Sequence, residues 1–328
     1  MKTTLALPLI ALAVALAGCS RGEPPAPPAA EPAAATQVPA EQPPAPQAWP
    51  REAIVKSLAP DGTVIHYRAY GSGEPAIVFV HGWSCDSGYW DGQLNHFAAQ
   101  STVITVDLAG HGKSPGSARK AWDMAHFGAD VAAAVQDAGA QRVVLVGSSM
   151  GGPVALEAAR LLPGQVIGIV GVDTFREIAV PFPKEQFAAL LEKMRADFAA
   201  TTAAFVADHF FTGRTDPVLK QWIVKDMAKA PPEVAIPAVT ALMDMDYRAA
   251  LDALDLPIVA LNSAGSPTDE AAIRAVEPRF RLVTLEGVGH FPMLEDPKTF
   301  NRVLGRIVAE WVKLEAVRNP LSKAAPTG

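Results

Sequence analysis

Short apolar segments alternate with helical patterns along most of this chain, and no other feature of the sequence restricts the fold as strongly. Most of these segments are apolar without a break, which is typical of strands buried on both faces of a parallel sheet. Apolar side chains recur at helical spacing between them. The order predicts an α/β fold with a mostly parallel central sheet and helices on both faces. The segments occupy residues 63–70, 76–80, 102–106, 142–146, 166–172, 257–261 and 280–285.

Residues 176–251 interrupt this alternation, because they have helical periodicity and no strand pattern. We expect a helical cap in which most bulky apolar side chains pack against one another and a minority line a pocket. The predicted organisation is a core of residues 51–175 and 252–318, a cap of residues 176–251 and a tail of residues 319–328. One apolar stripe of the cap consists of Phe187, Leu190, Leu191, Met194 and Phe198.

The N-terminus has the pattern of a targeting signal. Lys2 precedes an apolar run at residues 5–16, which is too short for a comfortable membrane span and suits the core of a signal peptide. The run ends in LAGC at residues 16–19, which resembles the bacterial lipobox. The resemblance implies that residues 1–18 form a signal peptide and that Cys19 is acylated after cleavage. A plain secretory signal is the alternative.

A tether is predicted to follow the signal. Residues 19–50 are rich in Pro and Ala and contain almost no β-branched or aromatic side chain. This composition cannot build a core and favours extended polyproline II. With Cys19 acylated, the expected location is the bacterial cell envelope, and Ser20 by resemblance favours the outer membrane, facing the periplasm. Cys85 is then left without an intrachain disulfide partner.

The charge balance argues against a nucleic-acid partner. Lys and Arg number 28 against 34 Asp and Glu, which gives a formal net charge of -6 at pH 7. The chain has no dense basic segment, which nucleic-acid binding requires. Hydrophobic residues make up 49% of the chain, enough to fill a sizeable core.

A G-x-S-x-G motif at residues 147–151 supplies the candidate nucleophile. It follows the strand predicted at residues 142–146 and precedes a helical pattern that includes Val154. A serine in this context lies on a sharp strand-to-helix turn, above a helix N-terminus that favours negative charge. Ser149 is therefore the candidate, whereas Ser148 has the wrong spacing to the glycines.

A serine nucleophile needs a base and an oxyanion hole. His290 follows the last predicted strand, so it is expected at the same edge of the sheet as Ser149 and is the candidate base. The candidate oxyanion donors are two backbone N–H groups. One belongs to Met150, directly after the serine, and the other to Trp83, which follows the strand at residues 76–80.

From about residue 51 to residue 317 the chain resembles α/β-hydrolase-fold serine hydrolases with a helical cap. The matching segments are HGW at 81–83, DLAGHGKS at 107–114, the elbow around Ser149, and GHF at 289–291. The resemblance implies a cofactor-free acyl transfer in which Ser149 attacks, His290 carries the proton and water resolves the acyl-enzyme. Haloalkane dehalogenases and epoxide hydrolases share the fold but carry Asp at the elbow.

The acid of the catalytic triad is the point where this chain departs from its relatives. They usually place it shortly after the penultimate strand, but residues 262–269 read NSAGSPTD, with no carboxylate at the early position. Asp173 is the preferred candidate, because it ends the strand predicted at residues 166–172 and some relatives use this position. Asp269 is the alternative, although its place after Thr268 is also typical of a helix N-terminus.

These features predict a membrane-tethered hydrolase of carboxylic esters with small or medium apolar acyl groups. The expected partners are a small ester-like substrate and, through Cys19, a membrane; no metal or cofactor is expected. Asp107 and His111 are interpreted as parts of a structural turn, because no His, Cys and Asp cluster has zinc-like spacing. The alternatives are a C–C bond, lactone or perhydrolase-type hydrolase with the same triad, and a non-catalytic binding lipoprotein.

Overall fold

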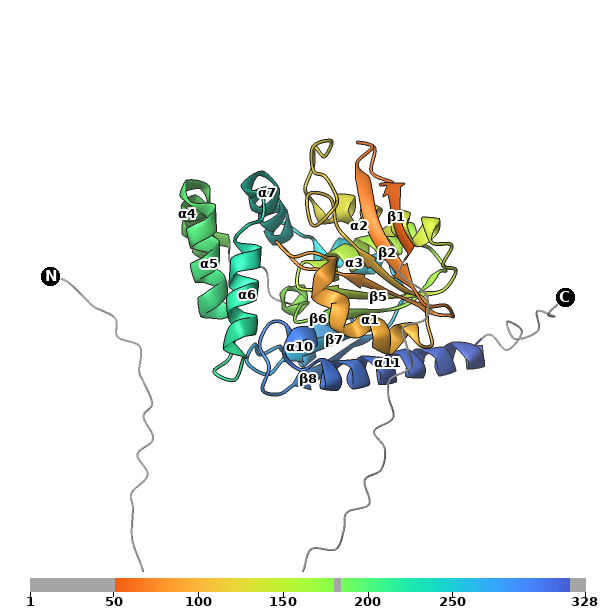
Figure 1. The fold of residues 1–328 in the computed structure, drawn as a ribbon. Coiled ribbons are helices and arrows are strands. Elements are labelled where there is room, and N and C mark those ends of the chain that lie inside the picture. Colours follow the sequence, from red (N-terminus) through yellow and green to blue (C-terminus); the bar gives the residue numbers. More distant parts are fainter. Residues whose placement is uncertain (1–50, 180–183, 319–328) are drawn as a thin grey trace, which may run out of the picture. The chain divides into compact units, whose positions relative to one another are not determined.

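An eight-stranded sheet forms the centre of the computed structural model, which describes residues 51–179 and 184–318 (Figure 1). The strand order is β1-β2-β4-β3-β5-β6-β7-β8. β2 pairs antiparallel with both β1 and β4, and the other neighbouring strands are parallel. The α/β fold predicted from the sequence is confirmed. The strands are β1 (Arg51–Lys56), β2 (Val64–Tyr70), β3 (Ala76–Val80), β4 (Val103–Val106), β5 (Val143–Ser148), β6 (Val166–Val172), β7 (Ile258–Ser263) and β8 (Phe280–Leu285).

The sequence patterns locate all of these strands except β1, with ends that differ from the observed ones by at most two residues. The central strands β3, β4 and β5 are buried at every position, which explains their unbroken apolar runs. β1 is an edge strand, and none of its residues is fully buried. Because an edge strand needs few apolar residues, the sequence of β1 cannot be distinguished from that of a loop by its hydrophobic pattern.

Helices cover both faces of the sheet (Figure 1). α2 and α3 pack together over one face, and α1 and α11 pack against each other over the opposite face. Asp296 caps the N-terminus of α11, since its carboxylate accepts a hydrogen bond from the backbone N–H of Thr299 at 3.0 Å. The helices of the core are α1 (Asp91–Ala98), α2 (Met124–Asp137), α3 (Gly151–Leu161), α9 (Glu270–Val276), α10 (Pro292–Glu295) and α11 (Pro297–Arg318), with the 3-10 turns η1 (Ser87–Trp90) and η2 (Arg176–Ile178).

Between β6 and β7 the described chain is helical and contains no strand, as the sequence predicts. Four of the helices, α4 to α7, stand beside the sheet in Figure 1, and α8 contacts α3. Asp197, Asp216 and Asp246 each begin a helix by accepting a backbone N–H bond. The helices of this segment are α4 (Lys184–Ala196), α5 (Phe198–His209), α6 (Pro217–Met227), α7 (Pro232–Met243) and α8 (Tyr247–Asp252).

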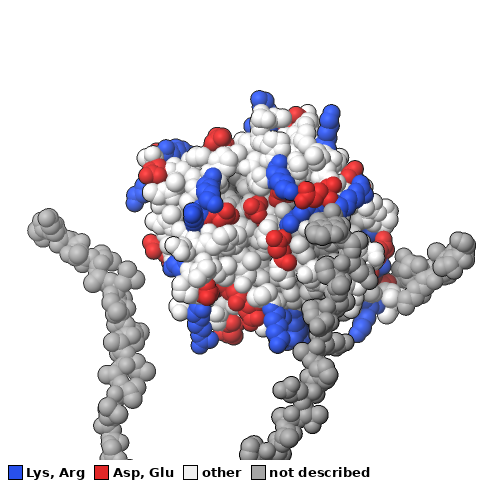
Figure 2. Space-filling view, viewed as in Figure 1, with Lys and Arg blue, Asp and Glu red and all other residues white. Residues whose placement is uncertain are grey.

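The predicted signal peptide, the acylation site Cys19, the tether and the tail at residues 319–328 lie outside the described residues. In the described ranges, no helix combines the length and apolar content that a membrane crossing requires. Figure 2 shows basic and acidic side chains interspersed over the face seen in Figure 1, without a broad surface of a single sign.

Candidate active site

Ser149 lies on a strained turn between β5 and α3. Its φ is 51°, in the left-handed region that side chains other than glycine rarely occupy. The backbone N–H of Ser149 donates to the carbonyl of Val172 at 2.9 Å, which ties the turn to the end of β6. The turn therefore presents the Ser149 side chain at the carboxyl edge of the parallel sheet, as the motif predicts.

The glycines on either side of Ser149 are required by close packing of the backbone. A Cβ on Gly147 would lie 2.0 Å from the carbonyl oxygen of Gly151, and a Cβ on Gly151 would lie 2.4 Å from that of Val80. Both distances are far shorter than any real contact of a Cβ atom, and the obstructing atoms belong to backbone. The glycines thus allow the sharp turn that exposes the serine.

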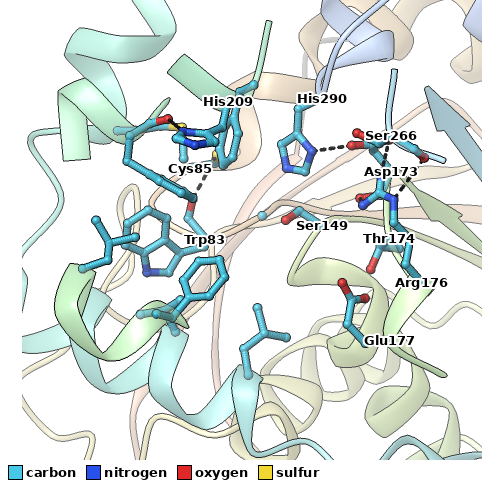
Figure 3. Close-up of a pocket in the computed structure, with 18 of the residues that line it drawn as sticks. Trp83, Cys85, Ser149, Asp173, Thr174, Arg176, Glu177, His209, Ser266 and His290 are labelled. Carbon is cyan, nitrogen blue, oxygen red and sulfur yellow. Dashed lines mark hydrogen bonds and ion pairs between the residues drawn. The ribbon is translucent and has the colours of Figure 1, made fainter. Parts of the chain in front are cut away.

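His290 and Asp173 meet across 117 residues of sequence at this same edge. Nδ1 of His290 lies 2.5 Å from Oδ2 of Asp173, and their side chains are 13% and 1% exposed. In Figure 3 the His290 ring lies above Ser149, with Asp173 on its far side. No hydrogen bond joins Ser149 to His290 in the described chain. Such bonds are often long without substrate and shorten when it binds.

Arg176 holds the other oxygen of Asp173. Its guanidinium donates to Oδ1 at 2.6 Å, and the backbone N–H of Ser263 donates to the same oxygen at 2.9 Å. Burial raises the pKa of Asp173, but the hydrogen bond and charge of His290 together with Arg176 and Ser263 lower it to about 2, from an ordinary 3.8. The carboxylate thus adds stability above about pH 3.8, which is lost as the pH falls through about 2.

Arg176 could not be identified as a site residue from the sequence. The only indication there is that a basic residue stands three positions after the candidate acid. Arg176 also ties the turn around Asp173 to the loop after β7, because its Nε donates to the carbonyl of Ser266 at 3.3 Å. Asp173 itself has a φ of 49°. Arg176 binds Oδ1 and the backbone carbonyl of this strained residue, which leaves Oδ2 to face the histidine.

The end of β7, where relatives usually carry the acid, supports Asp173 instead. The Asn262 side chain accepts from the backbone N–H of Thr174 and donates to its carbonyl, both at 3.0 Å. Asp269, the alternative acid, caps α9 by accepting from the N–H of Ala272 at 2.9 Å and does not line the cavity beside Ser149. The geometry therefore pairs His290 with Asp173 and leaves Asp269 in a helix-capping position.

The two candidate oxyanion donors remain available. In the described chain, the backbone N–H groups of Trp83 and Met150 donate no hydrogen bond. The indole Nε1 of Trp83 donates to the carbonyl of Ala235 in α7 at 2.7 Å, which fixes the loop after β3. The Trp83 side chain is thus packed and its backbone N–H makes no hydrogen bond in the described chain, so this N–H can serve as an oxyanion donor.

Asp107 and His111 have the structural positions that the sequence suggests. The Asp107 carboxylate accepts from the backbone N–H groups of Ser87 and Lys113, both at 2.9 Å. His111 is buried, and its Nδ1 lies 3.0 Å from the carbonyl of Ala109. Within residues 51–179 and 184–318, no group of three or more His, Cys, Asp or Glu side chains is arranged to hold a metal.

A cavity of about 260 Å³ lies over Ser149, His290 and Asp173, between the sheet edge and the cap (Figure 3). The expectation that only a minority of the bulky cap residues line a pocket is wrong. Four of the five stripe residues, all on α4, line the cavity, and α4 also packs against α5 and α7. The bulky apolar side chains of the cap that line the cavity are Phe187, Leu190, Leu191, Met194, Phe205, Phe210, Met227, Val239 and Leu242.

The cap also positions the candidate base. The backbone N–H of His290 donates to the carbonyl of Phe210, at the end of α5, at 2.8 Å. The Phe210 ring lies 4.3 Å from the imidazole, centroid to centroid. Glu295 accepts from the N–H of Gly289 and from the hydroxyl of Thr215. These contacts couple the His290 loop to the cap, which the sequence does not indicate.

The fold and this edge of the sheet define an enzyme of the α/β-hydrolase class. Residues 77–303 match the model of the Alpha/beta hydrolase family, and the chain belongs to that family. It is similar to the pimeloyl-(acyl-carrier protein) methyl ester esterase of Nitrosomonas europaea, at 26% identity over 249 residues that cover 72% of this chain and 96% of that protein.

Two further comparisons agree with this assignment. A solved thermophilic esterase from Thermogutta terrifontis has a TM-score of 0.69 and 25% identity, covering 80% of this chain and 99% of that one. A shorter stretch of 110 residues is 44% identical to a non-heme haloperoxidase of Rhodococcus erythropolis and covers 33% of this chain and 39% of that protein. The named relatives thus include esterases as well as another activity.

Proposed function

We propose that the protein is a serine carboxylesterase that cleaves small or medium apolar acyl esters through an acyl-enzyme on Ser149. The main support for this proposal is that Ser149, His290 and Asp173 line one cavity and that a hydrogen bond joins His290 to Asp173. The similarity to proteins named as esterases supports the same reaction.

In the proposed reaction, Oγ of Ser149 attacks the ester carbonyl while Nε2 of His290 takes the hydroxyl proton. The N–H groups of Trp83 and Met150 stabilise the oxyanion, and the carboxylate of Asp173 stabilises the imidazolium. The C–O bond to the alcohol then breaks, and His290 returns the proton to the leaving oxygen. Water repeats the sequence on the acyl-enzyme, which releases the acid and restores Ser149.

The cavity indicates the size of the acyl group. About 260 Å³ is a little below the roughly 300 to 1,000 Å³ that is usual for ligand pockets. Apolar side chains, most of them from the cap, supply more than half of the lining residues. An acyl chain of a few carbons fits such a space, whereas a long fatty acyl chain does not fit without movement of the cap.

A graded series of p-nitrophenyl esters tests this function. We expect the purified wild-type protein to hydrolyse acetate, butyrate and octanoate esters, with the highest kcat/KM in this range and little turnover of palmitate. A lactone series run in parallel distinguishes the related hydrolase reactions. Absence of turnover of every ester, or an optimum at palmitate, contradicts the proposal.

We further propose that acylated Cys19 anchors the enzyme in the cell envelope, at the outer membrane facing the periplasm. The support is the LAGC sequence at residues 16–19 and the Pro- and Ala-rich segment up to residue 50. Two or more acyl chains bind a membrane stably, at about 0.8 kcal/mol for each buried methylene group.

Replacement of the anchor cysteine tests the location. In a Gram-negative host, the wild-type protein is expected in the outer-membrane fraction, and Cys19→Ala in the soluble fraction or as an unprocessed precursor. Immunoblotting of the fractions measures the difference, and Cys85→Ala is the matched control, which is expected to stay with the membrane. Retention of mature Cys19→Ala in the membrane fraction contradicts an acyl anchor.

A further inference from the structure

The cavity over Ser149 has two chemically different walls. One is apolar and comes largely from α4 and α5. The other is polar and includes Thr174, Glu177 and Tyr247. In Figure 3, Thr174 and Glu177 lie below Ser149, on the opposite side of the cavity from His290. The apolar wall accounts for an acyl group, but it does not explain why the other wall carries polar groups.

Glu177 supplies a charge without a partner. It lies on η2, is partly buried, and makes no ion pair or hydrogen bond within the described chain. Among the described residues, the other Asp, Glu, Lys or Arg side chains that line the cavity are those of Asp173 and Arg176, which pair with each other at 2.6 Å. Among the described lining residues, the Asp, Glu, Lys and Arg side chains therefore leave one negative charge without a partner, which is located at Glu177.

Two hydroxyl groups of the same wall also form no hydrogen bond in the described chain. Tyr247 is 8% exposed, and its hydroxyl forms no hydrogen bond among the described residues. Burial raises the pKa of Tyr247 and the charge of Glu177 raises it further, so the phenol stays neutral. Asn262 fixes the backbone of Thr174 from both sides, but the Thr174 hydroxyl has no partner in the described chain.

We propose that Thr174, Glu177 and Tyr247 form a subsite for a protonated amine carried by the ester substrate. The inference rests on the proposed esterase function and specifies its substrate class. The ammonium group pairs with the Glu177 carboxylate, and a primary ammonium also donates hydrogen bonds to the hydroxyl oxygens, while the apolar wall contacts the rest of the substrate. Each polar group of this wall then gains a partner that the folded chain does not provide.

Pairs of esters with the same shape and different charge provide the test. The first pair differs in the alcohol part of the ester. Dimethylaminoethyl acetate carries a nitrogen, protonated at neutral pH, where isoamyl acetate carries a carbon. The methyl esters of dimethylaminobutyric acid and of its carbon isostere form the acyl-side pair. We expect wild type to prefer the ammonium ester in at least one pair, by about tenfold or more in kcat/KM.

Glu177→Gln removes the charge and keeps the size of the side chain. We expect this variant to lose the preference for the ammonium ester, with the ratio of the two kcat/KM values falling about tenfold, and Glu177→Asp to retain part of it. Glu185→Gln removes the same charge from an exposed position on α4 outside the cavity, so its ratio is expected to match wild type.

The outcomes separate this inference from the proposed function. If wild type prefers the neutral ester in both pairs, or if Glu177→Gln keeps the wild-type ratio, the amine subsite is contradicted while hydrolysis of neutral esters still supports an esterase. If no ester of either kind is hydrolysed, the proposed function itself fails. A change of ratio in Glu185→Gln equal to that in Glu177→Gln would assign the preference to overall charge and also overturn the subsite.

Discussion

Ser149→Ala is expected to abolish ester hydrolysis, with a fall in kcat of about a million-fold, the magnitude measured when a comparable nucleophile is removed. The physical reason is that no other group at the elbow can form the acyl-enzyme. The residual rate comes from binding and the oxyanion donors alone. Steady-state assays with p-nitrophenyl butyrate measure the fall in kcat. Labelling of the protein by a fluorophosphonate probe is expected to disappear in the same variant.

Ser148→Ala is the matched control. Ser148 is the neighbouring hydroxyl, but it is buried and its Oγ has no hydrogen-bond partner in the described chain. Its removal is expected to leave kcat and probe labelling close to wild type. Labelling that persists in Ser149→Ala and disappears in Ser148→Ala would reverse the assignment of the nucleophile.

Asp173→Asn is expected to lower kcat by about ten-thousand-fold, as when the acid of a comparable triad becomes an amide. An amide can donate a hydrogen bond to Nδ1 of His290, which favours the tautomer that cannot accept the serine proton. The change also leaves Arg176 without the charge that it pairs with at 2.6 Å. Both kcat and the melting temperature of the variant should be measured. A fall in kcat at an unchanged melting temperature indicates loss of the correct histidine tautomer and not loss of the fold.

Asp269→Asn gives the matched comparison for the alternative acid. Asn caps helices about as well as Asp, so α9 is expected to remain stable and kcat to remain near wild type. A near-normal kcat in Asp173→Asn, together with a large fall in kcat in Asp269→Asn, would contradict the assignment of Asp173 to the triad.

The candidate nucleophile and base could be predicted from the sequence because each follows a strand with a strong local pattern. Parallel strands bring their carboxyl ends to one edge of a sheet, so Ser149 after β5 and His290 after β8 are expected near each other. The choice between Asp173 and Asp269 could not be made with the same certainty. Both follow parallel strands, and only the contacts of the histidine distinguish them.

The apolar stripe of α4 shows a second limit of sequence reasoning. Its helical spacing predicts the helix, but the same spacing is compatible with packing inside the cap or with lining a cavity. The structure places the α4 residues of this stripe, Phe187, Leu190, Leu191 and Met194, in the lining of the cavity. Glu177 and Tyr247 lie seventy residues apart in sequence, and nothing in either local segment indicates that they border the same space.

The sequence by itself determined the α/β sheet, the serine elbow and the helical character of the cap, because periodicity, turn glycines and helix caps act within short windows of chain. The tertiary structure decided which carboxylate meets His290, that Arg176 holds this carboxylate, and which cap side chains face the cavity. These features depend on contacts between segments that are distant in sequence, and such contacts are set by the packing of the whole fold rather than by any local pattern.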